Sequence, residues 1–193
     1  MVSKTKWMEP RHTVNVTNRF TRDKTDSLQH AFFNGQGYAV LENLWGFWYG
    51  MNPNDAEAVL RFTAIERAMA NNLRSPDWQP HAATVQAGVF ASRFPNHSRT
   101  LWTIVNRNEY DVAGPELRVP FHAGVHFYDL WHGVVLATGE DPPSDKLKDI
   151  LAYMAQRSRR PLSSFSREWQ AVLQTMVDIR ATNPCPPRLL AWS

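Results

Sequence analysis

The spacing of hydrophobic and polar positions changes along the chain. Between residues 53 and 73, apolar side chains recur every three or four positions, which is the stripe of an amphipathic helix. These positions are Val59, Phe62, Ile65, Met69 and Leu73. Asn52 and Pro53 stand where a helix takes its N-cap and its first helical residue. The pattern therefore predicts one long helix over residues 53–73.

After residue 80, short apolar segments alternate with turn-forming residues, as in a series of strands. The segments cover residues 85–94, 100–106, 116–119, 125–130 and 134–138. Strands at this spacing predict a small antiparallel, β-sandwich-like domain over residues 81–140. Residues 141–193 are predicted as a helix capped by Ser144, a further helix around residues 167–176 and a Pro-rich tail or linker.

The front of the chain has a third pattern. Residues 1–30 are polar with scattered apolar positions, and they predict an irregular lead-in with a short helix over residues 23–30. Tyr38–Leu41 is a continuous apolar run, typical of a strand that is buried on both faces. This strand and the helix after it predict a β/α unit over residues 31–80. The chain as a whole is predicted to be α+β.

Composition narrows the classes of function. Of the 193 residues 43% are hydrophobic, which predicts a packed core. The net charge of +3 is small and its sources are scattered, which argues against a nucleic-acid partner. Cys185 is the only cysteine, and the seven histidines lack the spacing of a metal site, so no metal and no cofactor is predicted. His122 and His126 fall on a predicted strand, where their spacing holds them apart.

Neither a membrane helix nor a signal peptide is predicted. No apolar run approaches the roughly 18 residues that a membrane helix needs, and no apolar core follows the first charged residues. The sequence as written is that of a cytoplasmic chain, but its location stays open because a longer parent protein could be exported.

Eight tryptophans are the unusual feature of the composition. Indole rings can face the C–H side of a sugar, although they also fill cores. Glu42 ends the apolar run and precedes Trp45 and Trp48, at the position where an α/β barrel carries its reactive groups. A carboxylate there suits a glycosidase nucleophile or acid, with Asn34 or Asn43 as a polar neighbour. The alternative is that Glu42 binds only a backbone N–H or an arginine.

A glycosidase needs a second carboxylate, and the sequence offers no evident partner. Asp23 and Asp26 are interpreted as helix-start residues, and Asp129 is assigned to the solvent face of a strand. A barrel needs eight β/α units over about 250 residues, whereas residues 1–80 hold at most two. Glu42 is therefore a catalytic candidate without an acid partner in this chain.

Several motifs together resemble a group of bacterial glycosidase-like proteins, over roughly residues 4–180. They are Lys6-Trp7, Pro10-Arg11-His12, Phe32-Phe33-Asn34-Gly35, Gly37-Tyr38, Glu42-Asn43, Trp45-Gly46, the segment 105–111 and the segment 128–133. The resemblance implies that residues 31–80 are the last unit of a (β/α) barrel, incomplete here, and that a β-domain follows. In that group a formylglycine-generating-enzyme-like (sulfatase-modifying-factor) domain commonly comes next. The resemblance implies substrate binding by His12, Asn34, Asn43, Trp45 and Trp48.

The chain also departs from that group. It has Ala39 where the group usually carries an acidic residue, so Glu42 is a bystander if that acid was the functional one. Three hypotheses follow: a glycoside hydrolase fragment that is inactive alone, a non-catalytic carbohydrate-binding module, or a module that braces a neighbouring domain. The expected partners are a carbohydrate and the missing barrel portion or that neighbouring domain. Whether the chain is an enzyme stays open.

Overall fold

The computed structural model describes residues 1–18, 23–39, 51–97, 99–119, 125–137, 145–158, 172–178 and 188–192. The helices are α1 (Lys4–Met8), α2 (Thr25–Asn34), α4 (Pro53–Ala68), α5 (Ala70–Leu73) and α6 (Asp145–Ser158). The strands are β1 (Asn15–Val16), β2 (Gly37–Tyr38), β3 (Gln79–Ala82), β4 (Val89–Asn96), β5 (Arg99–Asn106), β6 (Gly114–Val119), β7 (His126–Asp129), β8 (Val134–Ala137), β9 (Val172–Asp178) and β10 (Arg188–Trp192). The predicted α+β class is confirmed.

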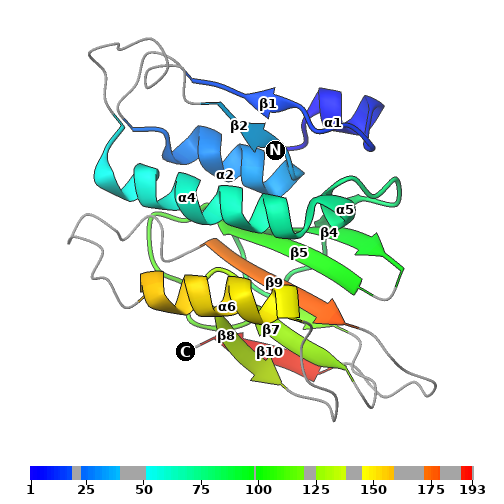
Figure 1. Ribbon diagram of the computed structural model, residues 1–193, viewed down its shortest axis with the longest axis vertical. Coiled ribbons are helices and arrows are strands. Elements are labelled where there is room, and N and C mark those ends of the chain that lie inside the picture. Colours follow the sequence, from blue (N-terminus) through cyan, green and yellow to red (C-terminus); the bar gives the residue numbers. More distant parts are fainter. Residues whose placement is uncertain are drawn as a thin grey trace.

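A six-stranded sheet lies at the centre of the molecule, in the order β3-β4-β5-β9-β7-β8 (Figure 1). Every neighbouring pair in it runs antiparallel. β5 pairs with β4 along its whole length, from Val89 opposite Asn106 to Asn96 opposite Arg99. On its other edge β5 pairs with β9, so a late segment of the chain lies between strands that come much earlier.

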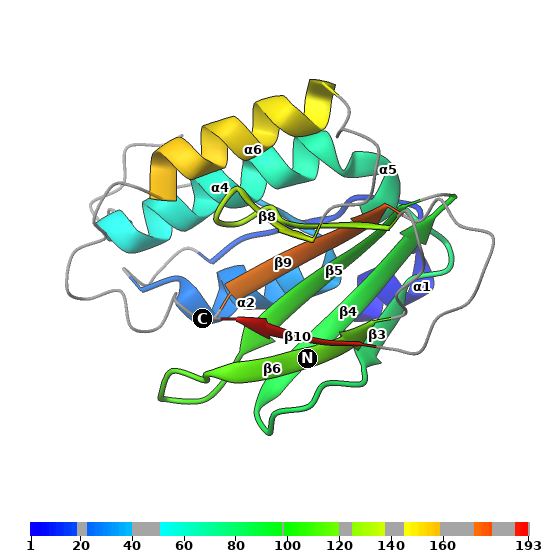
Figure 2. The same cartoon turned by 90° about the horizontal axis from the view of Figure 1, so that it is seen from below.

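Different layers cover the two faces of this sheet. On one face α2 and α5 contact β4 and β5, while α4 packs against α2 and α6 (Figures 1 and 2). A two-stranded ribbon of β6 and β10 lies on the other face (Figure 2). Along β5, Leu101 and Val105 join the core beneath the helices, whereas Trp102 and Ile104 join the core beneath the ribbon. Because both faces are covered, β5 is buried from residue 100 to residue 106.

The helix predicted over residues 53–73 is confirmed, with one interruption. The Asn52 side chain accepts a hydrogen bond from the Asp55 N–H at 2.8 Å, which caps α4. Phe62 and Ile65 point into the core as the spacing predicts. At Met69 the backbone leaves helical geometry (φ −109°), and α5 then completes the predicted span.

The predicted strands over the middle of the chain are confirmed as β4 to β8, within a few residues at each end. The helix predicted after Ser144 is confirmed as α6, although Ser144 itself lies outside the described residues. The helix predicted around residues 167–176 is wrong from Val172 onward, because β9 occupies that stretch. Pairing with β5 and β7 on its two edges satisfies the β9 backbone, and this tertiary pairing outweighs a local helical pattern.

The short helix predicted over residues 23–30 is confirmed as the first part of α2, but the rest of residues 1–30 is more regular than predicted, since it contains α1 and β1. Leu28 belongs to the core beneath the helices. Lys6 is fully buried, and its ammonium donates to the carbonyl oxygens of Pro10 at 2.7 Å and Leu73 at 2.5 Å. Burial lowers the pKa of Lys6 to about 8. The N-terminal segment is thus tied to the end of α5.

The hydrophobic core crosses the predicted boundary between residues 80 and 81. A single cluster includes Leu28, Phe62, Leu101, Tyr128 and Met154. The strand predicted over Tyr38–Leu41 begins as β2, which pairs in parallel with β1, and residues 40 and 41 lie outside the described residues. No closed barrel is found among the described strands, which form one six-stranded and two two-stranded sheets.

Candidate functional site

A polar groove of about 740 Å³ opens between the N-terminal end of α2 and the loop that follows β5. Its lining consists of Asn18, Asp23, Thr25, Asp26, Gln29, Asn106, Arg107, Asn108 and Glu109. All of these side chains are polar, and they include amides, carboxylates, a hydroxyl group and one guanidinium. A ligand in this groove would meet hydrogen-bond donors and acceptors from every lining side chain.

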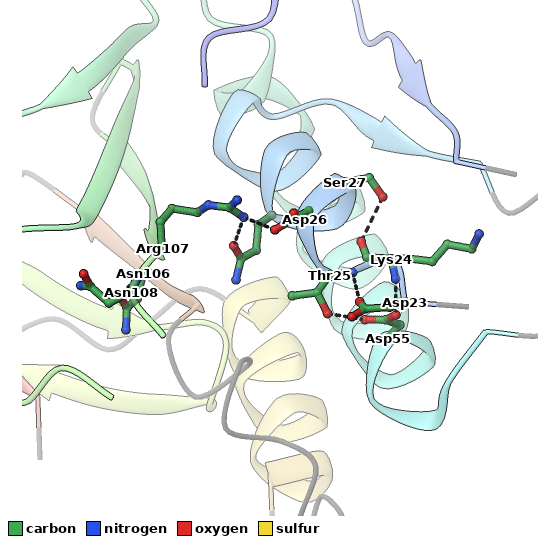
Figure 3. A network of polar contacts seen from close by, with 10 residues as sticks. Asp23, Lys24, Thr25, Asp26, Ser27, Asp55, Asn106, Arg107 and Asn108 are labelled. Atoms are coloured by element: carbon green, nitrogen blue, oxygen red, sulfur yellow. Dashed lines mark hydrogen bonds and ion pairs between the residues drawn. The ribbon is translucent and has the colours of Figure 1, made fainter. Parts of the chain in front are cut away.

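Arg107 reaches across the groove from the end of β5 to α2 (Figure 3). Its Nη1 donates to Asp26 Oδ1 at 2.6 Å and to Gln29 Oε1 at 2.7 Å. We call these three residues the groove bridge. A guanidinium carries five N–H donors in one plane, and the described residues take up only the donors of Nη1. The groove bridge therefore fixes the direction of the guanidinium and leaves Nε and Nη2 as donors for a ligand.

Side chains within the loop after β5 hold its shape. Asn106 Nδ2 donates to the carbonyl of Tyr110 at 2.9 Å, and Asn106 Oδ1 accepts the N–H of Asn108 at 2.8 Å. Asn108 Nδ2 in turn donates to the carbonyl of Ala87 at 2.9 Å. The loop thus closes on itself and on the turn before β4, which prearranges its polar groups.

Gly88 makes room for this loop. Its φ of +74° lies in the left-handed region, where other L residues are strained. A Cβ on Gly88 would meet Asn108 Oδ1 at 2.1 Å, and the Gly88 carbonyl accepts the N–H of Arg107 at 2.8 Å. Both the backbone conformation and the close approach of Asn108 therefore require glycine here.

A buried network fixes the α2 side of the groove. Asp55, in the first turn of α4, is fully buried and accepts hydrogen bonds from Lys24 N at 2.6 Å, Asn52 Nδ2 at 2.6 Å and Thr25 Oγ1 at 3.1 Å. We call these four residues the helix-start network; Lys24, Thr25 and Asp55 are labelled in Figure 3. One carboxylate thus serves the positive N-terminal ends of α2 and α4 together.

Asp23 and Asp26 both line the groove from the start of α2. The Thr25 N–H donates to Asp23 Oδ1 at 2.9 Å, so the predicted helix-start role of Asp23 is confirmed. Asp26 lies in the first turn of α2, as predicted, but it also accepts the bond from Arg107.

Of the residues predicted for the sugar site, Glu42, Asn43, Trp45 and Trp48 lie outside the described residues, so their roles stay predictions.

His12 and Asn34 are described, and neither lines the groove. His12 is exposed, with its Nδ1 at 3.2 Å from Glu9 Oε2. Asn34 is fully buried at the other end of α2, where it bonds the backbones of Met1, Ser3 and His30. Its hydrogen-bonding groups are engaged within the chain.

A second group of buried titratable side chains lies on β6 and β7. The assignment of Asp129 to a solvent face is wrong: it is 3% exposed, because the turn that follows β7 folds back onto its carboxylate. Its Oδ2 lies 2.5 Å from His132 Nδ1, and its Oδ1 accepts the N–H groups of Trp131 and His132. Burial, and secondarily the nearby Asp129, raise the pKa of Glu116 to about 7. His126 is buried on β7 and stacks on Tyr128, and His122 lies outside the described residues.

Sequence reasoning missed the groove itself. Residues 107 and 108 fall between two predicted strands, and the sequence assigns Asp26 only to a helix start. The available signal was the cluster of an arginine, a glutamate and two asparagines directly after a strand, a polar loop of the kind that carries binding residues.

No family model, curated protein or solved structure matches this chain. Within the described residues, no group of three or more His, Cys, Asp or Glu could hold a metal ion. Among the described helices, none has the length and apolar character to span a membrane.

Proposed function

We propose that this chain binds carbohydrate in the groove between α2 and the loop after β5. The observation that carries the proposal is the groove bridge, in which Arg107 is held in place while donors on two of its nitrogens face no described partner. Sugars present many hydroxyl groups at close spacing, and these suit fixed amide, carboxylate and guanidinium groups. The prearranged loop lowers the entropy that binding would cost.

The test is isothermal titration calorimetry with cellobiose, maltose and chitobiose as probes. We expect binding of at least one of these disaccharides and a loss of about tenfold or more in affinity for Arg107→Gln, since a hydrogen bond to a charged group contributes about 1.5–3 kcal/mol. Arg118→Gln is the matched control, because Arg118 is an exposed arginine on β6 outside the groove lining. Absence of binding to all three probes, or equal affinities of the two variants, would contradict the proposal.

Glycoside hydrolysis centred on Glu42 is a second proposal, and it rests on the resemblance to glycosidase-like proteins. Since no second carboxylate is assigned, we expect this chain to bind sugar without hydrolysing it. Turnover of an aryl glycoside that Glu42→Gln abolishes, with sugar binding kept, would favour catalysis instead.

With this second proposal we also propose that residues 31–80 are the last β/α unit of a barrel. The parallel pairing of β1 with β2 and the helix α4 that follows support a terminal β/α unit of a barrel over residues 31–80. The structural alternative, in which residues 81–140 brace a formylglycine-generating-enzyme-like domain, rests on the resemblance alone. Co-purification of this chain with such a domain, expressed separately, would test it.

A further inference from the structure

The charges that line the groove do not balance. Three carboxylates line it, those of Asp23, Asp26 and Glu109, against the single guanidinium of Arg107. Three negative charges and one positive charge leave the lining with a formal charge of −2. The whole chain, by contrast, has a formal charge of +3 at pH 7. The groove is therefore a negative region on a chain whose total charge is positive.

Charged groups behind the lining do not change this balance. Lys24 is fully buried, and its ammonium donates to the carbonyl oxygen of Asn18, which lines the groove. The fully buried carboxylate of Asp55 accepts the Lys24 N–H at 2.6 Å, so these two residues add one charge of each sign. Burial lowers the pKa of His30, with smaller contributions from the N-terminal ammonium and from Arg107, so this ring carries no charge at pH 7.

The unbalanced carboxylates come from the two walls of the groove. Arg107 pairs with Asp26 at 2.6 Å, and the two charges offset each other. Asp23 remains on the wall at the start of α2, where the Thr25 N–H donates to its Oδ1 at 2.9 Å. Glu109 remains on the loop after β5, and no hydrogen bond or ion pair of its carboxylate occurs among the described residues. A ligand that lies between the walls therefore has a carboxylate on either side.

The sign of this charge distinguishes between classes of sugar. A cleft lined by charges of one sign raises the local concentration of ligands of the opposite sign. An amino sugar carries an ammonium in place of a hydroxyl group, and this ammonium donates hydrogen bonds that a carboxylate accepts strongly. A uronic acid carries a carboxylate, which Asp23 and Glu109 would repel.

We propose that the groove selects amino sugars, with the ammonium between Asp23 and Glu109, over neutral sugars and over uronic acids. This inference names the class of sugar and rests on the proposed carbohydrate binding. Arg107 and the amides of the lining serve the hydroxyl groups that all three classes share. The two unbalanced carboxylates determine which class binds best.

The test is isothermal titration calorimetry with three β-1,4-linked disaccharides at about pH 6, where amino groups are protonated. Cellobiose is neutral, the glucosamine disaccharide has an ammonium in place of one hydroxyl group on each ring, and glucuronosyl-glucose has a carboxylate in place of one hydroxymethyl group. We expect the glucosamine disaccharide to bind about five- to tenfold more tightly than cellobiose, and glucuronosyl-glucose to bind about threefold more weakly. The preference should fall towards unity in about 1 M salt, which screens exposed charges.

Glu109→Gln tests the carboxylate on the loop. The substitution keeps the size of the side chain and removes its charge, so the ratio of the affinities for the glucosamine disaccharide and cellobiose should fall by about threefold. Glu9→Gln is the matched control and should keep this ratio. The Glu9 side chain is 65% exposed at the end of α1 and lies outside the groove lining.

The outcomes separate this inference from the proposed function. If Arg107→Gln weakens the binding of cellobiose, and the glucosamine disaccharide binds no more tightly than cellobiose, the groove binds sugar and the selection of amino sugars is overturned. Tighter binding of glucuronosyl-glucose than of cellobiose would also overturn it, because the guanidinium of Arg107 would then determine the preferred charge. A preference that Glu109→Gln leaves unchanged would place the ammonium elsewhere and overturn it too. If neither these probes nor maltose and chitobiose bind, the proposed function fails and the inference fails with it.

Discussion

The helix-start network and the groove bridge both place a carboxylate at the beginning of α2, but their surroundings differ. Asp55 is fully buried and accepts bonds from three different residues. Asp26 has a side chain that is 86% exposed and accepts one bond, from Arg107. A buried carboxylate that lacks partners is costly, so it is retained only where it is well satisfied. An exposed one has little effect on folding and can face a ligand.

The largest expected effect comes from removing the buried carboxylate. Asp55→Ala leaves the Lys24 N–H, the Thr25 hydroxyl and the Asn52 amide without their acceptor inside the protein. We expect a loss of about 3 kcal/mol in the free energy of unfolding, as for other broken buried charge networks. Urea denaturation would measure it, with the exposed Asp77→Ala as the control that should change stability by less than about 0.5 kcal/mol. If Asp55→Ala loses as little stability as the control, the buried carboxylate of Asp55 does not stabilise the fold more than an exposed one.

Glu116 sharpens the comparison, because it is a buried carboxylate in a less favourable setting than Asp55. It is 5% exposed, and its pKa of about 7 in the folded chain lies above the ordinary value of 4.5. Its contribution to stability is fully present below pH 4.5 and is lost as the pH rises through 7. The free energy of unfolding of the unmutated chain should therefore fall as the pH rises through this range. We expect this fall to be smaller in Glu116→Gln, by on the order of 2 kcal/mol.

Denaturation at pH 4.5, 6 and 8 tests this expectation for Glu116. The pKa of Glu66 on α4 is also raised to about 7 by burial, so part of the pH dependence should persist in Glu116→Gln. The double variant with Glu66→Gln should flatten the curve further. An unchanged pH dependence in the double variant would refute the assignment.

Gly88→Ala tests the groove side of the comparison with a smaller expected effect. Alanine at a φ of +74° is strained, and its Cβ would displace Asn108 from the loop. We expect a loss of about 1–2 kcal/mol in stability together with weaker sugar binding. Gly114→Ala is the control, since it also has a positive φ, of +102°, but a Cβ there would approach no atom closer than 3.7 Å. It should lose stability through strain and keep its binding.

Local patterns in the sequence predicted most of the secondary structure. The apolar spacing from Val59 to Leu73 specified α4 and α5, because one buried helix face follows directly from its period. The short strands were similarly readable from alternation and turn residues. β9 was not, since its conformation comes from pairing with β5 and β7, which are distant in the sequence.

The candidate site depends on contacts that no local pattern encodes. Asp26 and Arg107 are 81 residues apart and meet only when α2 packs on the sheet. Asp129 is a second example. Its position on a strand predicted exposure, whereas its carboxylate is buried against Trp131 and His132 and lies near Glu116 of β6. The sequence showed polar and charged residues at turns and helix starts, but it could not show which of them converge.

The smallest expected effect on stability belongs to the groove bridge. Asp26→Asn removes an ion pair whose carboxylate is 86% exposed, and such pairs contribute about 0–1 kcal/mol. Gln29 still accepts the bond from Arg107 Nη1 at 2.7 Å, so the guanidinium should keep its place. We expect the free energy of unfolding to change by less than about 0.5 kcal/mol, while Asp55→Asn at the same pH loses several times more. The measurement is urea denaturation in low and high salt, since the ion pair is screened and the buried network is not. If Asp26→Asn costs as much as Asp55→Asn, the carboxylate in the groove is a structural element like its buried counterpart, and the groove bridge is not free to serve a ligand.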